Sequence, residues 1–140
     1  MIIAVDFDGT VVTHDFPRVG KDIGAVPVLK KLLDRGHKLI LHTMRSDITN
    51  PTSEDKSLYV KSGDFLTDAI KWFNDHDIEL WGINENPEQK SWTSSPKPYA
   101  ELYIDDAALG CPLLENELFS TRPYANWIKI EKILIRKGVL

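Results

Sequence analysis

The feature that most constrains the fold is the first ten residues, MIIAVDFDGT, in which a short apolar run ends abruptly in acids. Residues 1–5 are apolar and rich in β-branched side chains, which is typical of a strand buried on both faces of a parallel sheet. Asp6 and Asp8 follow at once, and an unpaired carboxylate is too costly to bury. We therefore expect this strand to end at the carboxyl edge of the sheet, where ligands bind in parallel α/β folds. A simple turn-capping role for the two acids is the alternative.

Length and composition indicate one globular domain spanning residues 1–140. A formal net charge of -4 gives no basic face for nucleic acid. The apolar N-terminal run meets an acid at position 6 and is too short for a signal peptide or a membrane span. The single cysteine, Cys111, excludes an internal disulfide. We expect a soluble cytoplasmic protein without nucleic-acid or membrane partners, and the sequence leaves its oligomeric state open.

Hydrophobic periodicity predicts alternating strands and helices in the first half of the chain. Residues 11–24 show no sustained period and are expected to form a loop or small β-flap over the end of the first strand. Apolar residues at helical spacing then predict a helix between Pro27 and Gly36. Residues 38–43 (KLILHT) read as a second strand, so the chain opens with a right-handed βαβ unit whose strands are parallel.

The second half of the chain is predicted with less regular connections. Residues 46–63 are expected to be a long loop with a partial helical turn at 58–60, followed by a helix over 65–73 capped by Asp64 or Ser62. The remaining predicted elements are a strand at 80–83, an exposed loop at 84–98, a strand at 101–104 and a closing helix that starts at Pro123.

Polar side chains follow three of these apolar runs: Asp6 and Asp8, then Thr43, then Asp105 and Asp106. If the strands are parallel neighbours, all of these side chains lie at one edge of the sheet, and Lys97 can reach back to that edge. Four carboxylates gathered there would repel one another unless a cation joined them. Oxygen-only ligation of this kind is what Mg²⁺ accepts, so the sequence predicts a Mg²⁺ site.

The ordered motifs DFDGT, LILHT, Lys97 and YIDDAALG resemble those of the haloacid dehalogenase superfamily of phosphohydrolases. That superfamily has an Asp-x-Asp-x-Thr motif, a Thr or Ser after a strand, a Lys and a terminal pair of acids. The resemblance covers the chain from Met1 to about Leu109. It implies a Rossmann-like three-layer α/β sandwich with a mostly parallel central sheet. The connections leave room only for core elements, so we expect no cap domain.

The same resemblance implies roles for the acids. Asp6 would be the nucleophile that forms an aspartyl-phosphate, and Asp8 would be the general acid and base. The metal would be held by Asp6, the main-chain carbonyl of Asp8, and Asp105 and Asp106, although the sequence does not say which of the last two touches it directly. An acid at position 8 favours ester hydrolysis over dehalogenation, because a dehalogenase protonates no alkoxide.

Three further residues are expected to bind the substrate phosphate. The resemblance implies that the Thr43 hydroxyl and the Lys97 ammonium contact its oxygens. Arg45 is a candidate for gripping an anionic group, with a solvated surface cation as the equal alternative. We expect His14, in contrast, to be an ordinary surface residue.

Together these features predict a Mg²⁺-dependent phosphatase that acts on a phosphorylated small molecule or macromolecule. A catalytically silent phosphate-binding or regulatory domain on the same fold is the alternative. A receiver-type signalling domain also combines acids, a threonine and a lysine, but its acid pair closes the first strand, whereas here the pair follows Lys97.

Overall fold

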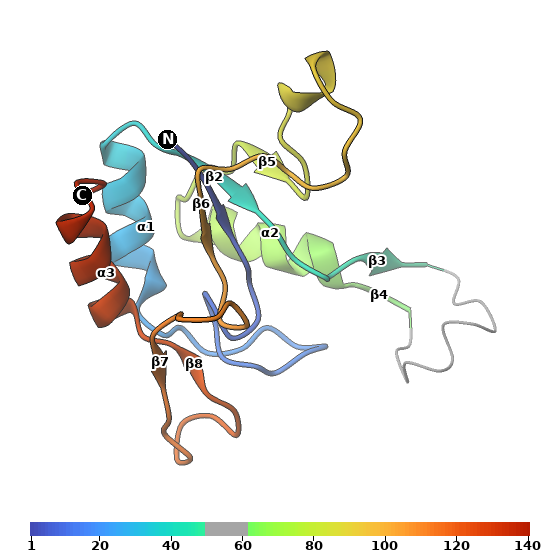
Figure 1. Cartoon of the computed structure of the whole chain (residues 1–140). Helices are drawn as coiled ribbons and strands as arrows, with labels where there is room; N and C mark the ends of the chain where they lie inside the picture. The colour runs from blue at the N-terminus through green and yellow to red at the C-terminus, as the bar shows by residue number, and fades with distance from the viewer. Residues whose placement is uncertain (50–61) are drawn as a thin grey trace.

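The chain folds around one parallel sheet. The computed structural model describes residues 1–49 and 62–140. The central sheet has four parallel strands in the order β5-β2-β1-β6, which are Gly82–Ile83, Lys38–Leu41, Ile2–Val5 and Leu102–Ile104 (Figure 1). The predicted α/β class with a parallel, Rossmann-like central sheet is therefore confirmed.

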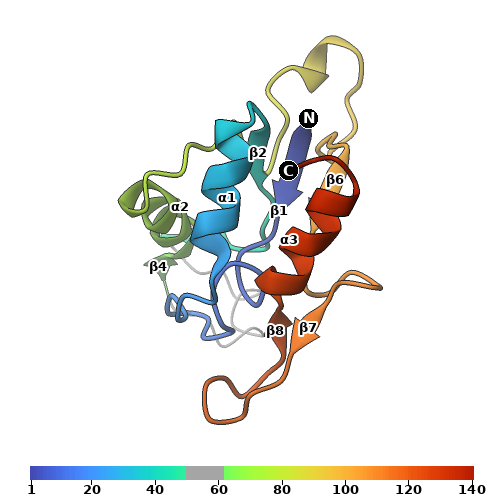
Figure 2. The same ribbon diagram turned by 90° about the vertical axis from the view of Figure 1, so that its left-hand side faces the viewer.

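Three helices contribute to the main hydrophobic core, and they are α1 (Ala25–Asp34), α2 (Phe65–Asp75) and α3 (Trp127–Arg136). Side chains alternate along a strand, and Ile3 and Val5 of β1 join Leu39 and Leu41 of β2 in this core. Figure 2 shows α1 and α3 side by side in front of β1. None of the helices in the described part of the chain combines the length and apolar character needed to cross a membrane.

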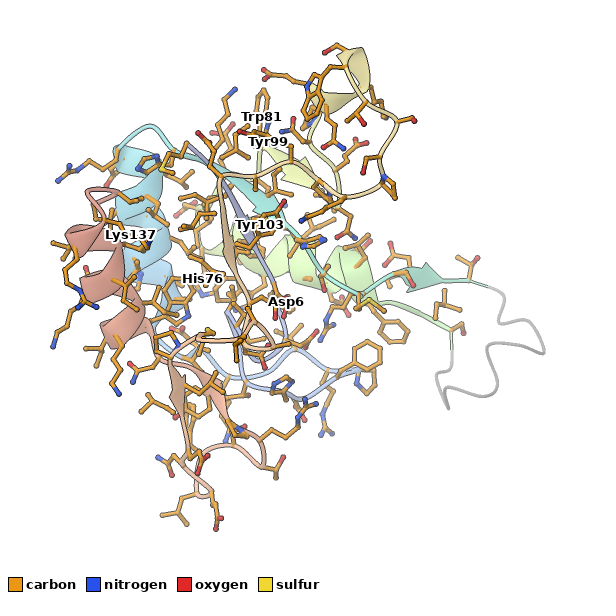
Figure 3. All side chains as sticks on the ribbon, viewed as in Figure 1. Asp6, His76, Trp81, Tyr99, Tyr103 and Lys137 are labelled. Atoms are coloured by element: carbon orange, nitrogen blue, oxygen red, sulfur yellow. The ribbon has the colours of Figure 1, made fainter. Side chains whose placement is uncertain are left out.

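The opposite face of the sheet carries Ala4, Ile40 and Tyr103, which are neighbours in the strand register. Ala4 and Ile40 are fully buried but lie outside the core cluster that the helices share. The segment 84–101 borders this face, and the Tyr103 hydroxyl donates a hydrogen bond to the Pro98 carbonyl at 2.6 Å. In Figure 3, Tyr103 lies between Asp6 and Tyr99. This segment therefore contacts Tyr103 on that face, together with His42, whose ring centroid lies 6.1 Å from that of Tyr103.

Residues 84–98, predicted to be an exposed loop, are organised around the buried side chain of Gln89. Its amide nitrogen donates to the carbonyls of Ser95 and Lys97 at 2.8 Å, and its amide oxygen accepts from the Tyr99 N–H at 2.6 Å. Gln89 begins a short 3-10 helix, Gln89–Ser91. The Gln89 side chain therefore satisfies backbone groups that would pair with one another in a helix or a sheet, and so it orders this segment.

The predicted loop over residues 46–63 contains two short strands instead of being irregular throughout. β3 (Asp47–Ile48) pairs antiparallel with β4 (Gly63–Asp64). The partial helical turn expected at 58–60 lies outside the described residues. The hairpin ends directly at α2, so it fixes where that helix begins.

The N-terminus of α2 is capped from β3 rather than from the residues predicted to do so. Asp64 occupies the cap position, but its side chain makes no capping hydrogen bond. The Asp47 carboxylate instead accepts from the N–H groups of Leu66 and Thr67, both at 2.9 Å, and from the Thr67 hydroxyl at 2.6 Å. The hydrogen bond from the Thr67 hydroxyl contributes most, and together these bonds lower the pKa of Asp47 below its ordinary value.

The prediction that the closing helix starts at Pro123 is wrong. Tyr124–Ala125 forms β8, which pairs antiparallel with β7 (Leu113–Leu114), and α3 begins three residues beyond Tyr124, at Trp127. Partner strands hold the backbone extended at this point and override the helix-start preference of proline. The actual cap is Asn126, whose side-chain oxygen accepts a hydrogen bond from the Lys129 N–H at 3.1 Å.

We predict that Asn126→Ala lowers the free energy of unfolding by about 1 kcal/mol, because α3 loses its N-terminal side-chain acceptor. The matched control is Asn74→Ala, at an exposed position within α2. Alanine favours a helix more than asparagine does, so we expect no loss there. Urea denaturation measures both variants, and equal destabilisation by the two changes would contradict the capping role.

Candidate functional site

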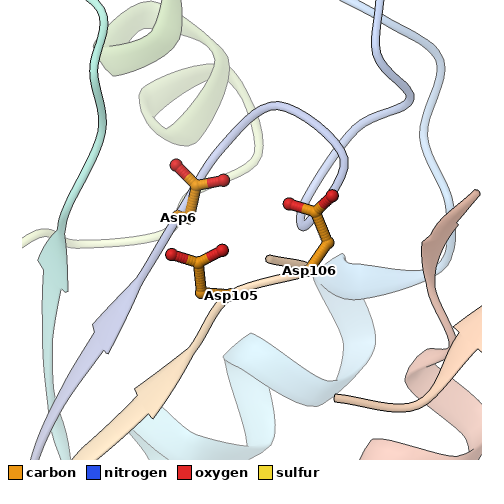
Figure 4. A group of neighbouring side chains, drawn as sticks. All are labelled: Asp6, Asp105 and Asp106. Carbon is orange, nitrogen blue, oxygen red and sulfur yellow. The ribbon is translucent and has the colours of Figure 1, made fainter. Parts of the chain in front are cut away.

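Three carboxylates meet at the carboxyl edge of the sheet. The hydrogen bonding of β1 to β6 continues one residue past β1, because the Asp6 N–H donates to the Ile104 carbonyl at 3.0 Å. This register sets Asp6 beside Asp105, the next residue along the other chain segment. Asp6, Asp105 and Asp106 each offer an oxygen within 4.8 Å of the others (Figure 4). Three of the four carboxylates predicted to gather at this edge therefore meet in the structure, and that of Asp8 does not join them.

The hydroxyl of Thr10 links the two sets of acids. Thr10 is fully buried, and its Oγ1 lies 3.2 Å from a carboxylate oxygen of Asp6 and 3.2 Å from one of Asp106. The same oxygen accepts a hydrogen bond from the Asp106 N–H at 2.9 Å. A hydroxyl has one proton to donate, so it serves one carboxylate at a time.

The C-terminal part of the chain holds the loop after β1, which carries Gly9 and Thr10. The indole N–H of Trp127 donates to the Thr10 carbonyl at 2.7 Å, and the Ala125 N–H donates to the Gly9 carbonyl at 2.8 Å. Thr10 was not among the residues predicted for the site. Its place in the Asp-x-Asp-x-Thr pattern was the signal that could have found it.

His14 is a site residue, and the prediction that it lies at the surface is wrong. Its Nε2 lies 2.9 Å from a carboxylate oxygen of Asp106, and the two side chains are each 14% exposed. A side chain at Gly9 would collide with this imidazole, because a Cβ there would lie 2.0 Å from Nε2 of His14. Gly9 also has a φ of 83°, which favours glycine. The imidazole of His14 reaches Asp106 only because the flap folds back over the sheet edge, and no local sequence pattern predicts that fold.

Burial gives Asp6 an unusual affinity for its proton. Desolvation by burial, together with the neighbouring charges of Asp105 and Asp106, raises the pKa of Asp6 to about 7. A hydrogen bond from the backbone of Phe7 opposes it in part. Burial and the two neighbouring carboxylates all penalise a negative charge on Asp6, so a cation bound there would remove much of the cost.

Asp8 lies apart from the acidic cluster and forms a bidentate ion pair with Arg45. The guanidinium donates to both carboxylate oxygens, from Nε and from Nη2, each at 2.7 Å. The Arg45 side chain is 1% exposed and that of Asp8 is 19% exposed. Two parallel hydrogen bonds of this kind fix the orientation of the carboxylate plane in addition to the attraction between the opposite charges.

The remaining donors of Arg45 bind main-chain carbonyls. Nη1 donates to Pro17 at 3.4 Å and to Phe65 at 3.3 Å, and Nη2 donates to Arg18 at 2.7 Å. With the two bonds to Asp8, all of the guanidinium N–H groups are engaged. Arg45 thus faces inward, which corrects both predictions made for it, the phosphate-binding residue and the solvated cation. The carbonyls come from the flap and from the start of α2, and sequence spacing could not place them there.

Thr43 follows β2 at the predicted edge. Its N–H donates to the side chain of Asn84 at 2.8 Å, and its Oγ1 accepts from the Arg45 N–H at 3.1 Å. A hydroxyl that accepts one bond still has its own proton to donate, so Thr43 remains able to bind an anionic oxygen.

Lys97 lies in the 84–101 segment, and its ammonium is 5.2 Å from the centroid of the Tyr103 ring. Within residues 1–49 and 62–140 it forms no ion pair with the acids of the cluster. Tyr103 lies two residues before Asp105, so Lys97 stands over the sheet face that leads to the site. Among the described residues, the structure thus brings together three of the four predicted acids and leaves Lys97 unpaired with them.

The donor set of the cluster fits a hard divalent cation. Asp6, Asp105 and Asp106 supply carboxylate oxygens, and no sulfur or nitrogen ligand is part of this group within the described residues. Mg²⁺ is bound in proteins by one or more carboxylates with water completing its shell.

Comparison of the chain with protein-family models and with curated proteins gives no match. Among solved structures it is similar to a conserved protein from Bacteroides thetaiotaomicron, with 32% identity and a TM-score of 0.70. The similarity covers 98% of this chain and 91% of the other. The description of that protein states no activity. The chain therefore belongs to the same family as the conserved Bacteroides thetaiotaomicron protein.

Proposed function

We propose that the protein is a Mg²⁺-dependent phosphatase of the haloacid dehalogenase type, which cleaves phosphate monoesters through an aspartyl-phosphate on Asp6. The observation that supports this best is the convergence of Asp6, Asp105 and Asp106, whose carboxylate oxygens lie within 4.8 Å of one another. The resemblance of the four motifs adds the reaction type. Asp8 and Thr43 follow the adjacent strands β1 and β2 at the same edge of the sheet.

Mg²⁺, held by the three carboxylates and the Asp8 carbonyl, would supply positive charge that offsets the phosphoryl oxygens. In the first step a carboxylate oxygen of Asp6 attacks phosphorus, and the bond from phosphorus to the ester oxygen breaks. Asp8 gives its proton to the departing oxygen. In the second step water attacks phosphorus, Asp8 takes a proton from that water, and the bond from phosphorus to Asp6 breaks.

Arg45 acts in this scheme as a positioning residue. Its guanidinium donates one hydrogen bond to each carboxylate oxygen of Asp8 and so occupies one lone pair on each. The second lone pair of an oxygen remains available to carry the proton that is transferred. The bidentate pair holds the carboxyl plane fixed while the proton moves, which matters because proton transfer requires hydrogen-bond distance in the reacting complex.

The first prediction from this proposal concerns turnover of a generic aryl phosphate, para-nitrophenyl phosphate. We expect the wild type to hydrolyse it with Mg²⁺ and not with a chelator, and we expect Asp6→Asn to be inactive because the nucleophile is lost. Asp8→Asn should be slower by roughly 10²–10⁴-fold, the usual contribution of a general acid or base. The matched control is Asp34→Asn, at an exposed position of α1, which should retain full activity.

Equal rates for the wild type and Asp6→Asn would contradict the covalent mechanism. Mg²⁺-dependent binding of inorganic phosphate without any turnover would instead support the alternative, a catalytically silent phosphate-binding domain. Isothermal titration calorimetry on the wild-type chain distinguishes the two.

A second prediction separates positioning from substrate binding at Arg45. Arg45→Ala should lower kcat by roughly 100-fold, because Asp8 loses its fixed direction, while KM changes little. The same change should cost about 3 kcal/mol of stability, since Asp8 is left largely buried without its partner. Arg45→Lys should recover part of kcat.

The matched control for Arg45 is Arg18→Ala, which removes an exposed flap cation whose ion-pair partner among the described residues is Asp15, and this change should alter neither quantity much. A large rise in KM with kcat preserved in Arg45→Ala would mean that Arg45 binds the substrate, contrary to the positioning role.

The third prediction uses the raised pKa of Asp6. The metal-free native protein keeps a proton on Asp6 up to about pH 7, whereas the unfolded chain loses it near the ordinary value of 3.8. The stability contributed by this proton is therefore present at low pH and lost as pH rises through about 7. Urea unfolding with a chelator, from about pH 5 to about pH 8, should show this loss in the wild type but not in Asp6→Asn.

Mg²⁺ added at the upper end of this pH range should restore the stability of the wild type, because it neutralises the charge that burial penalises. Parallel pH profiles for the wild type and Asp6→Asn would show that Asp6 titrates normally.

A further inference from the structure

Beside Asp8 the structure has a cavity of about 330 Å³ with mainly apolar walls. Its apolar lining comes from the flap (Phe16), from the residue after Thr43 (Met44), from β3 (Ile48) and from the start of α2 (Phe65). Figure 1 shows the flap extending toward the side of the molecule where β4 meets α2. The cavity is thus built by segments from separate parts of the chain, and Asp8 lies in its wall.

Two of the apolar side chains around this cavity are exposed, whereas Ile48 and Phe65 are half-buried. Met44 is 98% exposed and Phe16 is 46% exposed. The rings of Phe16 and Phe65 lie 5.2 Å apart between centroids and are tilted by 57°. A group of exposed apolar side chains next to a functional acid is typical of a ligand site, because the apolar surface is covered when the ligand binds.

The charged residues of the cavity offer nothing to a charged ligand. Among the described residues they are Asp8 and Arg45, which neutralise each other through their bidentate pair. Ser46 is the one uncharged polar residue that lines the cavity within the same part of the chain. A leaving group rich in hydroxyls or charges would therefore lose its hydration here without gaining partners.

We propose that this cavity is the leaving-group subsite and that the substrate is a phosphate monoester whose alcohol carries an uncharged aromatic ring close to the ester oxygen. This inference rests on the proposed function, in which Asp8 protonates the departing oxygen. The acid must lie within hydrogen-bond reach of that oxygen, so the rest of the alcohol lies against the wall that Asp8 shares.

The size and chemistry of the cavity favour a ring. A volume of about 330 Å³ is at the lower end of ligand pockets, enough for a single or fused ring but not for a dinucleotide. Phenylalanine rings pack edge to face or offset against another ring, and the thioether of Met44 also favours contact with an aromatic group.

Two substrates with similarly basic alkoxide leaving groups test this inference, benzyl phosphate and propyl phosphate. With Mg²⁺, the wild type should show a kcat/KM for benzyl phosphate at least about tenfold above that for propyl phosphate, the scale of discrimination in an apolar pocket. Phe16→Ala and Met44→Ala should each reduce this ratio severalfold. Met44 is almost fully exposed, so its replacement should not unfold the protein.

The matched control is Trp92→Ala. Trp92 is also an exposed aromatic residue, at 63% exposure, but it belongs to the 84–101 segment and packs against Tyr99 at a centroid distance of 5.7 Å. It does not line the cavity, so its removal should leave the ratio unchanged.

The outcomes separate the inference from the proposed function. Hydrolysis of both esters with equal kcat/KM overturns the aromatic subsite and leaves the phosphatase intact. Hydrolysis of neither overturns the phosphatase, and calorimetric binding of benzylphosphonate and propylphosphonate then decides on the subsite. Tighter binding of benzylphosphonate that Phe16→Ala abolishes supports an aromatic-binding site beside Asp8 without the leaving-group role, whereas equal or absent binding of the two phosphonates overturns the site as well.

Discussion

The pairing of β1 with β6 is the constraint on which the candidate site depends. The register sets Val5 against Ile104, so the next residues, Asp6 and Asp105, are forced together at the sheet edge. The two segments are nearly a hundred positions apart in sequence, and the hydrophobic core under the sheet holds them in place against the repulsion of their acids. Burial of Asp6, and to a smaller extent this forced proximity to Asp105 and Asp106, raises the pKa of Asp6.

Asp6 and Asp8 are two residues apart in sequence but have opposite electrostatic surroundings. Asp6 faces two further carboxylates, and Asp8 faces a guanidinium that contacts both of its oxygens. Enzymes that use two carboxylates commonly separate their roles by environment rather than by residue type. Here the separation arises because the chain turns immediately after β1, so that one acid stays over the sheet edge and the other turns toward Arg45.

The sequence predicted those parts of the structure that depend on local patterns. The apolar runs at 1–5 and 38–43 gave strands, and the polar side chains that follow them fell at one edge because parallel strands end together. The start of α3 was misplaced because β7 holds Tyr124–Ala125 in an extended pairing, a contact that proline statistics cannot anticipate. His14 and Arg45 were misjudged for a related reason, since the partners of each lie on segments remote in sequence.

The flap at 11–24 connects the proposed catalytic acids with the cavity that is proposed to bind the leaving group. At one point it places His14 on Asp106, and a few residues later the carbonyls of Pro17 and Arg18 bind the guanidinium that holds Asp8. Phe16 lies between these two attachments and forms part of the cavity wall beside Asp8. A segment anchored on both sides cannot swing as a free lid. The position of the Phe16 ring in the cavity wall is therefore fixed by the same flap contacts that orient Asp106 and Asp8. A change in the flap that weakened the preference for an aromatic substrate would also disturb the geometry of Asp8.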